Sequence, residues 1–391
     1  MKICVMTSVY ALSDDDRNGS FLVESTKHLV RRGHEVNVFA PSYAGQGDHR
    51  VNGVPVHRFR YFFPRWENLT HGQGAPNRIR NRFYLFVAFF YIVAGAISAI
   101  RFCRKKRFGL IHVHWPFPHG IWGFLAGRAS GTPMVLTFHG AEILLSKKFF
   151  FVNYFLRHAI KHARAIICNS SYTAQEVARL TERPIAVIPF GCTVRDRPSI
   201  KKEIKERREI LFAGRLIARK GLDYLLRAMP LIKKEIDVQL HVVGDGNMAD
   251  AWKRLACHLG IGESVTFHGT VSNERLESLY EAADIFVLPA IVDDRGDTEG
   301  LGVVLIEALS FCTPAVASSV GGIPDIIVHE KTGLLVPQKD PEALANAVVR
   351  VLKDTVFAKR LAEEGLRRVR RYFDWDRITN DLIAVYQAAS A

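Results

Sequence analysis

The sequence contains the stretch Glu299-Gly300-Leu301-Gly302-Val303-Val304-Leu305-Ile306-Glu307, which is more informative about fold and function than any other segment. The glycines at 300 and 302 can open a helix, and the apolar run after them predicts a buried helical body that carries Glu307. A buried carboxylate is costly unless its charge is compensated, and either a ligand's paired hydroxyl donors or a structural Arg or Lys would compensate it. With helical spacing, Glu299 lies about 12 Å from Glu307 and would meet the ligand's other end. The backbone amides of residues 300 to 302 would face an anion between them.

Shorter motifs surround this segment in a fixed order. They are Gly214-Arg215-Leu216, Lys220-Gly221, Val243-Gly244-Asp245-Gly246, Ala283-Asp284-Ile285-Phe286-Val287-Leu288-Pro289, the run from Cys312 to Asp325 and the run from Lys331 to Val336. Together with the two acids, they closely resemble the retaining family 4 glycosyltransferases. That family has the GT-B fold, so the resemblance implies an α/β protein of two tandem Rossmann-like doubly wound domains with an interdomain cleft. The resemblance is dense from residue 205 to 345 and thinner before that.

Apolar strand-like runs alternate with helical stretches along the chain, which predicts doubly wound sheets. We expect strands at 3–8, 35–40, 110–114, 134–138, 165–168 and 186–188, and again at 209–213, 239–243, 265–268, 285–288, 315–317 and 333–336. The polar run 195–208 contains Pro198 and predicts a linker. The expected domains are 1–190 for the acceptor and 191–371 for the donor. The resemblance implies that 372–391 packs back on the first domain as a helix.

The composition is that of a globular protein. The chain has 391 residues, of which 48% are hydrophobic and 24% charged, enough for two cores. Its six cysteines lie far apart without a Cys-x-x-Cys pair, which favours buried reduced thiols and argues against a zinc site built from them. The apolar start, Lys2 to Tyr10, is short and precedes Asp14-Asp15-Asp16, so it fits a buried strand better than a signal peptide. We therefore expect a cytoplasmic protein.

The net charge of +14 is distributed unevenly. Residues 1 to 190 contain 25 Lys and Arg against 10 Asp and Glu, a balance of +15, whereas residues 191 to 391 contain 28 against 29, a balance of −1. A basic half implies an anionic partner: nucleic acid, an acidic membrane surface or an anionic substrate. We find no recognition module for nucleic acid and do not expect nucleic-acid binding.

Residues 83 to 100 form an apolar segment without a charge, flanked by Arg78, Arg80 and Arg82 on one side and by the basic run Arg101 to Arg107 on the other. Its length alone would allow it to span a bilayer. Spanning would separate the strand at 110–114 from the first two strands of the same expected sheet, and we reject it for that reason. Two interpretations remain: a helix buried in the first core, or one partly exposed against anionic lipid headgroups. The local basic charge favours the second, which would place the protein peripherally on the inner face of the membrane.

The resemblance assigns donor-binding roles in the second domain. It implies that Arg215 and Lys220 grip the diphosphate, that Glu307 binds the ribose hydroxyls and that Glu299 contacts the donor sugar. Backbone amides of Gly300, Leu301 and Gly302 would contact sugar and phosphate. The acidic loop from Asp293 to Asp297 suggests a metal site, but the family uses no metal, so we expect neither metal nor cofactor.

The resemblance also assigns residues in the first domain. His139 would lie near the anomeric centre, orient the donor sugar and stabilise the departing charge, and Gly19 belongs to a loop that approaches donor and acceptor. His112, His114 and His119 have a spacing that suggests a metal cluster. The family shows a similar pattern without metal, so we expect these histidines to line the cleft.

The resemblance implies a metal-independent retaining glycosyltransferase that moves a sugar from a nucleotide-diphosphate sugar to a hydroxyl acceptor, in glycan, polysaccharide or glycolipid biosynthesis, and retention rests on the resemblance alone. The basic first half suggests an acceptor that is anionic or membrane-borne, such as a lipid-linked glycan. Two alternatives are a nucleotide-sugar epimerase on the same fold and a non-catalytic membrane-surface binding protein.

Overall fold

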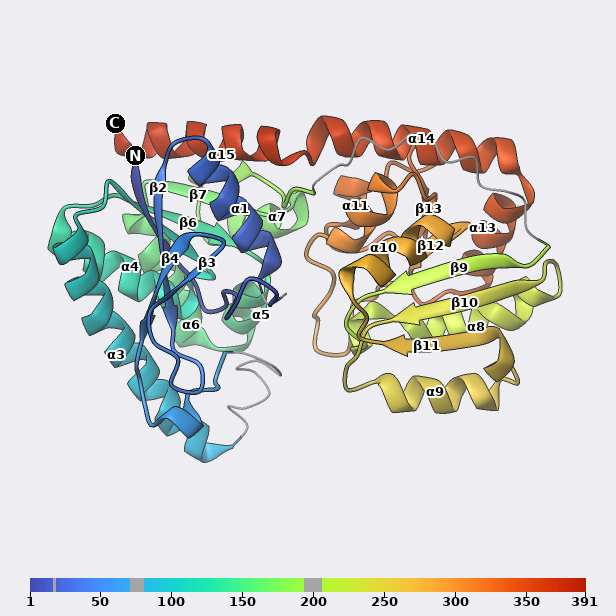
Figure 1. Ribbon diagram of the computed structural model, residues 1–391, viewed down its shortest axis with the longest axis horizontal. Helices are drawn as coiled ribbons and strands as arrows, with labels where there is room; N and C mark the ends of the chain where they lie inside the picture. Colours follow the sequence, from blue (N-terminus) through green and yellow to red (C-terminus); the bar gives the residue numbers. More distant parts are fainter. Residues whose placement is uncertain (17–18, 71–80, 193–205) are drawn as a thin grey trace. The chain divides into compact units, whose positions relative to one another are not determined.

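The computed structural model describes residues 1–16, 19–70, 81–192 and 206–391 and contains two compact units (Figure 1). The first unit comprises Met1–Gly191 together with Trp375–Ala391, and the second comprises Cys192–Asp374. The last helix of the chain, α15 (Trp375–Ser390), therefore belongs to the first unit. Most of the predicted linker lies outside the described residues.

The first unit is built on an eight-stranded sheet with the order β3-β4-β2-β1-β5-β6-β7-β8. Its parallel strands include the six that the sequence predicted: β1 (Lys2–Met6), β2 (Glu35–Pro41), β5 (Leu110–His114), β6 (Met134–Phe138), β7 (Ala165–Cys168) and β8 (Ala186–Val187). The sequence analysis missed the hairpin of β3 (His49–Val51) and β4 (Val54–Phe59) at the sheet edge. Asn52 and Gly53 form its two-residue turn with φ of 48° and 79°, and this dipeptide is a strong hairpin signal.

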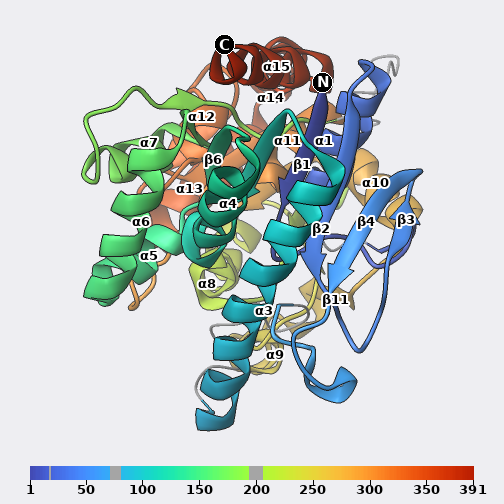
Figure 2. The same ribbon diagram turned by 90° about the vertical axis from the view of Figure 1, so that its left-hand side faces the viewer.

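Two apolar cores lie on opposite faces of this sheet, because successive strand residues point to opposite sides. Ile3 and Val5 of β1 belong to the core covered by α1 (Ser20–Arg31) and α15. Cys4 and Met6 belong to the other core. That core is covered by α3 (Arg82–Lys106), α4 (Pro116–Ser130) and α6 (Phe150–His162), as Figure 2 shows. Shorter helices α5 (Ala141–Lys148) and α7 (Ser171–Ala178) follow β6 and β7.

Helix α3 contains the apolar segment 83–100, for which a buried helix and a partly exposed helix were both possible. A stripe of residues at intervals of three and four is buried: Tyr84, Val87, Tyr91, Gly95, Ala99 and Cys103. Gly95 lets α3 approach α4, since a Cβ there would lie 2.3 Å from the Trp122 ring. The opposite face is apolar and exposed, so the helix is only partly buried. By length and composition α3 could cross a membrane, with a mean hydropathy of 2.2. However, β1 pairs directly with β5, so the strands before and after α3 belong to one sheet, and this pairing is the reason given above for rejecting a spanning role.

The second unit contains a parallel six-stranded sheet with the order β11-β10-β9-β12-β13-β14, and all six strands were predicted. They are β9 (Arg208–Ala213), β10 (Val238–Val243), β11 (Val265–Gly269), β12 (Ile285–Leu288), β13 (Ala315–Ser318) and β14 (Leu334–Val336). The helices are α8 (Leu222–Lys233), α9 (Ala249–His258), α10 (Asn273–Ala282), α11 (Val303–Ser310), α12 (Ile323–Ile326), α13 (Pro341–Lys353) and α14 (Thr355–Tyr372). The strand order reverses between β9 and β12, and ligands of such sheets bind at the carboxyl edge of this switch point.

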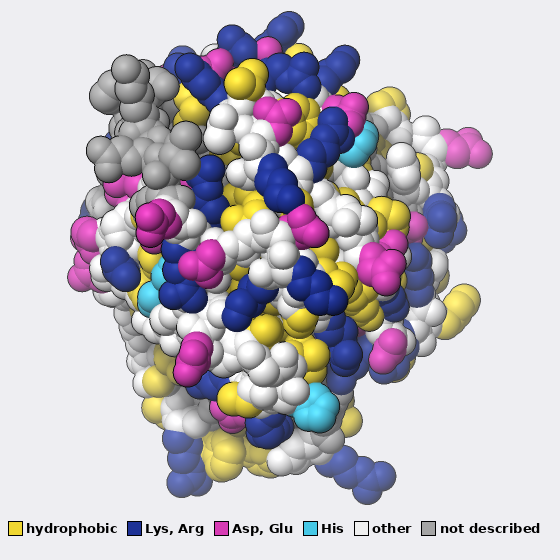
Figure 3. All heavy atoms as spheres, turned by 90° about the vertical axis from the view of Figure 1, so that its right-hand side faces the viewer, with side chains coloured by type: hydrophobic (Ala, Val, Ile, Leu, Met, Phe, Trp, Pro, Cys, Tyr) yellow, Lys and Arg dark blue, Asp and Glu magenta, His cyan; other side chains and the backbone are white. Residues whose placement is uncertain are grey.

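The surface charge of the second unit agrees with its near-neutral balance. On the face shown in Figure 3, basic and acidic side chains are interspersed. None of the six cysteines, all of which lie in the described residues, forms a disulfide: Cys4, Cys103 and Cys168 are buried, Cys192 and Cys312 are partly buried, and Cys257 is exposed. The expectation of buried thiols is therefore wrong for Cys257, which lies in the last turn of α9.

Candidate active site

The second unit brings the predicted donor residues to the switch point of its sheet. The loop after β9 carries Arg215 and Lys220, and the segment after β12 carries Glu299 and the start of α11. Because β9 and β12 are adjacent parallel strands, the two loops leave the same edge. The loop that carries Arg215 and Lys220 lies between a strand and a helix that starts at Leu222, as the sequence analysis expected.

Glu299 forms a buried ion-pair cluster. Its Oε2 accepts a hydrogen bond from the Lys220 ammonium and a second one from Arg219 Nη1 at 3.1 Å. Arg219 Nε also lies 3.3 Å from Asp297 Oδ2. Burial alone would raise the pKa of Glu299, but the charges of Lys220 and Arg219 lower it to about 2. Burial lowers the pKa of Lys220, an effect that Glu299 partly offsets.

Arg219 is a site residue that the sequence analysis missed. It lies in the short 3₁₀ turn Ala218–Lys220, which directs Arg219 and Lys220 toward the same carboxylate. The signal available in the sequence was its position next to Lys220. Arg215, in contrast, is exposed at the start of the same loop.

Glu307 differs in two respects from the prediction. It is only partly buried on α11, and its Oε2 accepts a hydrogen bond from the hydroxyl of Tyr280 at 2.9 Å. Tyr280 is buried on α10 and stacks on Phe311, so its ring is fixed. Burial and the neighbouring Glu307 carboxylate raise the pKa of Tyr280 well above its ordinary value. The hydroxyl therefore remains a donor that orients this carboxylate.

The glycine segment before α11 is a loop, and the assumed helical spacing of Glu299 and Glu307 does not apply. The helix begins at Val303, and Gly302 before it has a φ of 93°. Leu301 is 2% exposed as a whole residue and Gly302 is also buried, so neither the side chain nor the backbone of Leu301 is openly accessible to a ligand, in contrast to the predicted backbone contact. The Gly321-Gly322 turn packs directly against the backbone of this loop. A Cβ at Gly321 would lie 2.0 Å from the Glu299 carbonyl oxygen, and one at Gly322 would lie 2.2 Å from the Gly300 carbonyl oxygen.

In the first unit, the strand order reverses between β1 and β5, and His139 follows the next strand, β6, where it is partly accessible. Its Nε2 lies 3.1 Å from Nδ1 of His114. Trp115 and Phe190 stack on its ring at centroid distances of 4.2 and 5.5 Å, and Phe21 lies 5.8 Å away. Since Phe21 is in the first turn of α1, the Gly19 loop reaches the same place. The sequence analysis missed this aromatic cage.

Buried Glu142 fixes the backbone at His139 and was also missed. Its Oε1 accepts the His139 backbone N–H at 2.8 Å, while its Oε2 is buried without a hydrogen-bond partner among the described residues. Burial raises the pKa of Glu142 to about 7, and backbone hydrogen bonds oppose this shift. An acid three residues after the histidine, in the first turn of α5, was the signal available.

The other histidines make structural hydrogen bonds. His112 contacts Thr137 at 2.6 Å and Tyr386 of α15 at 2.7 Å. His119 lies 3.0 Å from the Tyr91 hydroxyl. Burial lowers the pKa of His139 and His112 to about 3. These rings are therefore neutral near pH 7. The described part of the chain contains no group of three or more His, Cys, Asp or Glu that could hold a metal.

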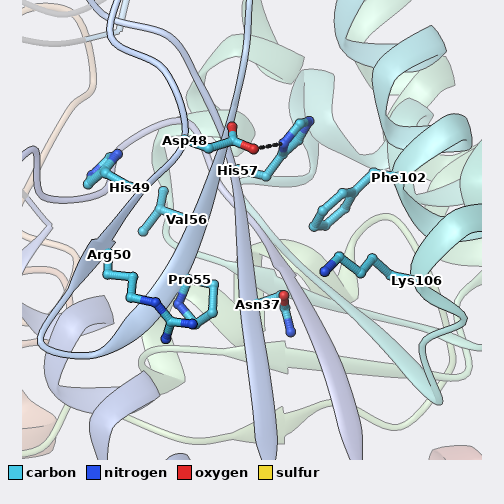
Figure 4. Close-up of a pocket in the computed structure, with 9 residues that line it drawn as sticks. All are labelled: Asn37, Asp48, His49, Arg50, Pro55, Val56, His57, Phe102 and Lys106. Atoms are coloured by element: carbon cyan, nitrogen blue, oxygen red, sulfur yellow. Dashed lines mark hydrogen bonds and ion pairs between the residues drawn. The ribbon is translucent and has the colours of Figure 1, made fainter.

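A separate pocket of about 310 Å³ lies beside β3, β4 and the end of α3 (Figure 4). His57 lies in it, with Nδ1 2.8 Å from Asp48 Oδ2 and its ring stacked on Phe102 at 4.6 Å. It contains none of the predicted site residues.

Two family models match the chain in succession: Glycosyltransferase Family 4 over residues 19–196 and Glycosyl transferases group 1 over residues 195–368. The GDP-mannose-dependent alpha-(1-6)-phosphatidylinositol monomannoside mannosyltransferase of Mycobacterium tuberculosis is 33% identical over 357 residues, which cover 87% of this chain and 92% of that protein. An uncharacterized glycosyltransferase of Methanocaldococcus jannaschii is 29% identical over 381 residues, which cover 92% of this chain and 91% of that protein.

Solved structures share the fold. Sucrose-phosphate synthase from Thermosynechococcus elongatus has a TM-score of 0.79 at 22% identity and covers 99% of this chain and 98% of its own. Anabaena HepE in complex with UDP and glucose has a TM-score of 0.73 at 18% identity over 98% of both chains. At these identities the likeness concerns the fold alone. The sequence matches and the fold together show that the chain belongs to the group 1, family 4 glycosyltransferases of the GT-B fold.

Proposed function

We propose that this glycosyltransferase is metal-independent and retaining, and that it moves a sugar from a nucleotide-diphosphate sugar to a hydroxyl acceptor in glycan, polysaccharide or glycolipid biosynthesis. The observation that carries the proposal is the cluster of Arg219, Lys220 and Glu299 at the switch point, with Arg215 exposed beside it. A departing nucleoside diphosphate needs fixed positive charge, and Arg215, Arg219 and Lys220 would supply it without a metal ion.

We propose the remaining donor contacts from the local surroundings of each side chain. Glu307, oriented by Tyr280, is available to accept hydrogen bonds from the ribose hydroxyls. Glu299 stays ionised because of its two cationic neighbours and would accept hydrogen bonds from the sugar. His139 is neutral, so its ring can donate one hydrogen bond to a sugar hydroxyl without placing a full charge beside the reacting carbon.

In the proposed reaction, the bond from the anomeric carbon to the diphosphate oxygen breaks, and a bond to the acceptor oxygen forms on the same face of the sugar. The proton of the acceptor hydroxyl passes to the leaving diphosphate. No protein nucleophile takes part. An inverted product, or a glycosyl-enzyme trapped for mass spectrometry, would contradict this mechanism.

Donor binding tests the proposal directly. The mycobacterial relative is named as GDP-mannose-dependent, so GDP-mannose is the first donor to compare with UDP- and ADP-sugars. A ligand that binds only the folded state at 100 times its Kd stabilises the protein by about 2.7 kcal/mol, which is a measurable rise in Tm. We expect one nucleotide class to raise the Tm equally with and without EDTA. No shift with any class would contradict the proposal, and a shift abolished by EDTA would contradict metal independence.

For the acceptor, we propose an anionic or lipid-borne hydroxyl compound presented at the cytoplasmic side of a membrane. The support is the +15 balance of residues 1 to 190, which attracts anions. Turnover of the lipid-borne acceptor should fall with rising ionic strength. A soluble neutral acceptor used equally well at low and high salt would contradict this part. Epimerisation of the donor in the absence of any acceptor would favour the epimerase alternative.

A further inference from the structure

We infer that the first unit docks on an anionic lipid bilayer through two apolar segments, the outer face of α3 and the junction of α5 and α6, and that this docking presents a lipid-borne acceptor to the His139 site. The choice of acceptor rests on the proposed function, whereas the docking itself does not. We call these two segments together the docking face. Its members are Phe83, Leu85, Phe86, Phe89, Phe90, Val93 and Ile97 on α3, and Phe149, Phe150, Phe151, Tyr154 and Phe155 at the junction.

The exposure of these side chains is concentrated and large. Of the 18 large apolar side chains that are exposed among the described residues, 12 belong to the docking face. Phe150 is 87% exposed, Tyr154 63% and Phe89 61%. Exposed apolar residues scattered singly need no explanation, but contiguous groups mark an interaction surface. Aromatic rings are also the side chains that favour the membrane interface.

The two segments lie over the same face of the sheet. Helix α4 packs between α3 and α6 (Figure 2). Phe117, near the start of α4, lies 6.2 Å from Phe151 and 6.4 Å from Phe155. On the other side, Phe62 contacts Phe83, Phe86 and Phe90 of α3 at 5.6 to 6.1 Å. One flat partner can therefore reach both segments.

The docking face borders the His139 site. Helix α4 begins directly after β5, and α5 directly after His139, so both start at the carboxyl edge of the sheet. Phe117 is two residues from Trp115, which stacks on His139. A headgroup held at a bilayer that touches Phe151 would lie near this edge. The position of the aromatic groups thus gives a reason for a lipid-borne acceptor that is independent of the net charge.

Charge identifies the partner as an anionic bilayer and argues against a second copy of the chain. Residues 82 to 164 contain 12 Lys and Arg and one acid, Glu142, a balance of +11. Glu142 is buried and Glu176 of α7 is paired with Lys147 and Arg179, so the exposed charge of residues 82 to 164 is positive. Two copies paired through this face would bring like charges together, which is costly. Anionic headgroups would neutralise the same charges, and each Lys or Arg near such a surface contributes to binding.

Vesicle co-sedimentation of the full chain without any substrate tests the inference. We expect binding to phosphatidylcholine vesicles containing phosphatidylglycerol to be about tenfold or more tighter than to phosphatidylcholine alone, and to weaken with salt. The variants Phe86→Ser/Phe89→Ser and Phe150→Ser/Tyr154→Ser should each lose about tenfold or more in partitioning, because each removes two aromatic anchors. The control Val356→Ser changes an 80% exposed side chain on α14 and should bind like the original protein.

Other outcomes would overturn the inference. They are the absence of vesicle binding, equal binding to neutral and anionic vesicles, and unchanged binding of both double variants. A dimer in solution that Phe86→Ser/Phe89→Ser dissociates would assign the face to a second copy instead. Donor hydrolysis and Tm shifts with nucleotide sugars, measured on the same variants without lipid, should be unchanged. If the original protein showed neither donor hydrolysis nor a Tm shift with any nucleotide sugar, the proposed function would be contradicted, whereas the vesicle-binding result would still stand.

Discussion

Among single residues, Glu142 offers the sharpest test of how the first unit positions His139. Glu142→Gln keeps an oxygen that can accept the His139 backbone N–H, whereas Glu142→Leu removes the acceptor and leaves that N–H unsatisfied. We expect kcat/KM to fall about 10- to 100-fold in the Leu variant and less than about threefold in the Gln variant. The affinity for the nucleotide alone, measured by calorimetry, should be the same in both, because the residues proposed to bind the nucleotide, as distinct from the sugar, lie in the second unit. Equal losses in the two variants would show that the hydrogen bond is not what matters.

Lys220 and Glu299 test the ion-pair cluster of the second unit. Lys220→Met leaves a buried carboxylate with one cationic neighbour fewer, and breaking a buried pair in this way costs about 3 to 5 kcal/mol. Adding Glu299→Gln removes the stranded charge, so the double variant should be more stable than Lys220→Met alone. Urea unfolding at pH 7 measures this. Because the pKa of Glu299 is lowered to about 2, its contribution is complete above its ordinary value of 4.5 and is lost as the pH falls toward 2. If the stability losses of the two single substitutions simply added up in the double variant, Lys220 and Glu299 would not be energetically coupled.

The sequence predicted the residues whose chemistry appears in a motif and missed those defined by packing. Glu299, Lys220 and His139 occur next to glycines and at strand ends, which is where ligand sites of α/β folds lie. Phe21, Trp115 and Phe190 come from three distant segments and meet only in three dimensions. No local pattern distinguishes such a cage from ordinary core aromatics.

Among the elements, the loop before α11 depends on its contact with the Gly321-Gly322 turn. Gly321 and Gly260 both have a left-handed φ, of 55° and 68°, but only at Gly321 would a Cβ collide with backbone, at 2.0 Å from the Glu299 carbonyl oxygen. We expect Gly260→Ala to cost about 1 kcal/mol from backbone strain alone. Gly321→Ala should cost at least about 2 kcal/mol more and weaken donor binding, because the loop carrying Glu299 must move. Thermal unfolding and donor titration of the two variants check this prediction. Equal losses of stability in both variants would show that the contact between Gly321 and the loop is not important.

Strand positions were predictable because a parallel strand buried on both faces is a continuous apolar run. In the missed hairpin, β3 has only three residues and lies at the sheet edge, where polar residues such as His49 and Arg50 are accommodated, whereas β4 has six residues and pairs with β2. The exposure of α3 could not be read from its sequence. A helix that is apolar on all sides gives no periodic signal for the side that packs. Gly95 and Trp122, whose contact decides the orientation, are separated by a strand.

At the scale of the whole molecule, the buried histidines of the first unit predict its response to acid. Burial lowers the pKa of His112 and His139 to about 3 and of His119 to about 4, and burial together with the neighbouring histidines lowers the pKa of His114 well below its ordinary value. Between pH 6.5 and 4 the unfolded chain binds a proton at each of these four positions and the folded chain does not. Glu142 acts in the opposite sense, because its pKa is raised to about 7 and the folded state holds its proton longer.

For these five groups alone, the difference is four protons minus one, or three, which corresponds to a limiting slope of about 4 kcal/mol per pH unit. The first unit should therefore lose stability steeply as the pH falls below 6.5. Urea unfolding at several pH values between 5 and 7 measures the slope. His119→Gln should reduce it by about one proton, or 1.4 kcal/mol per pH unit, whereas His162→Gln, at an exposed position of α6, should leave it unchanged. A flat profile, or equal effects of the two substitutions, would show that the buried rings already carry protons in the folded state.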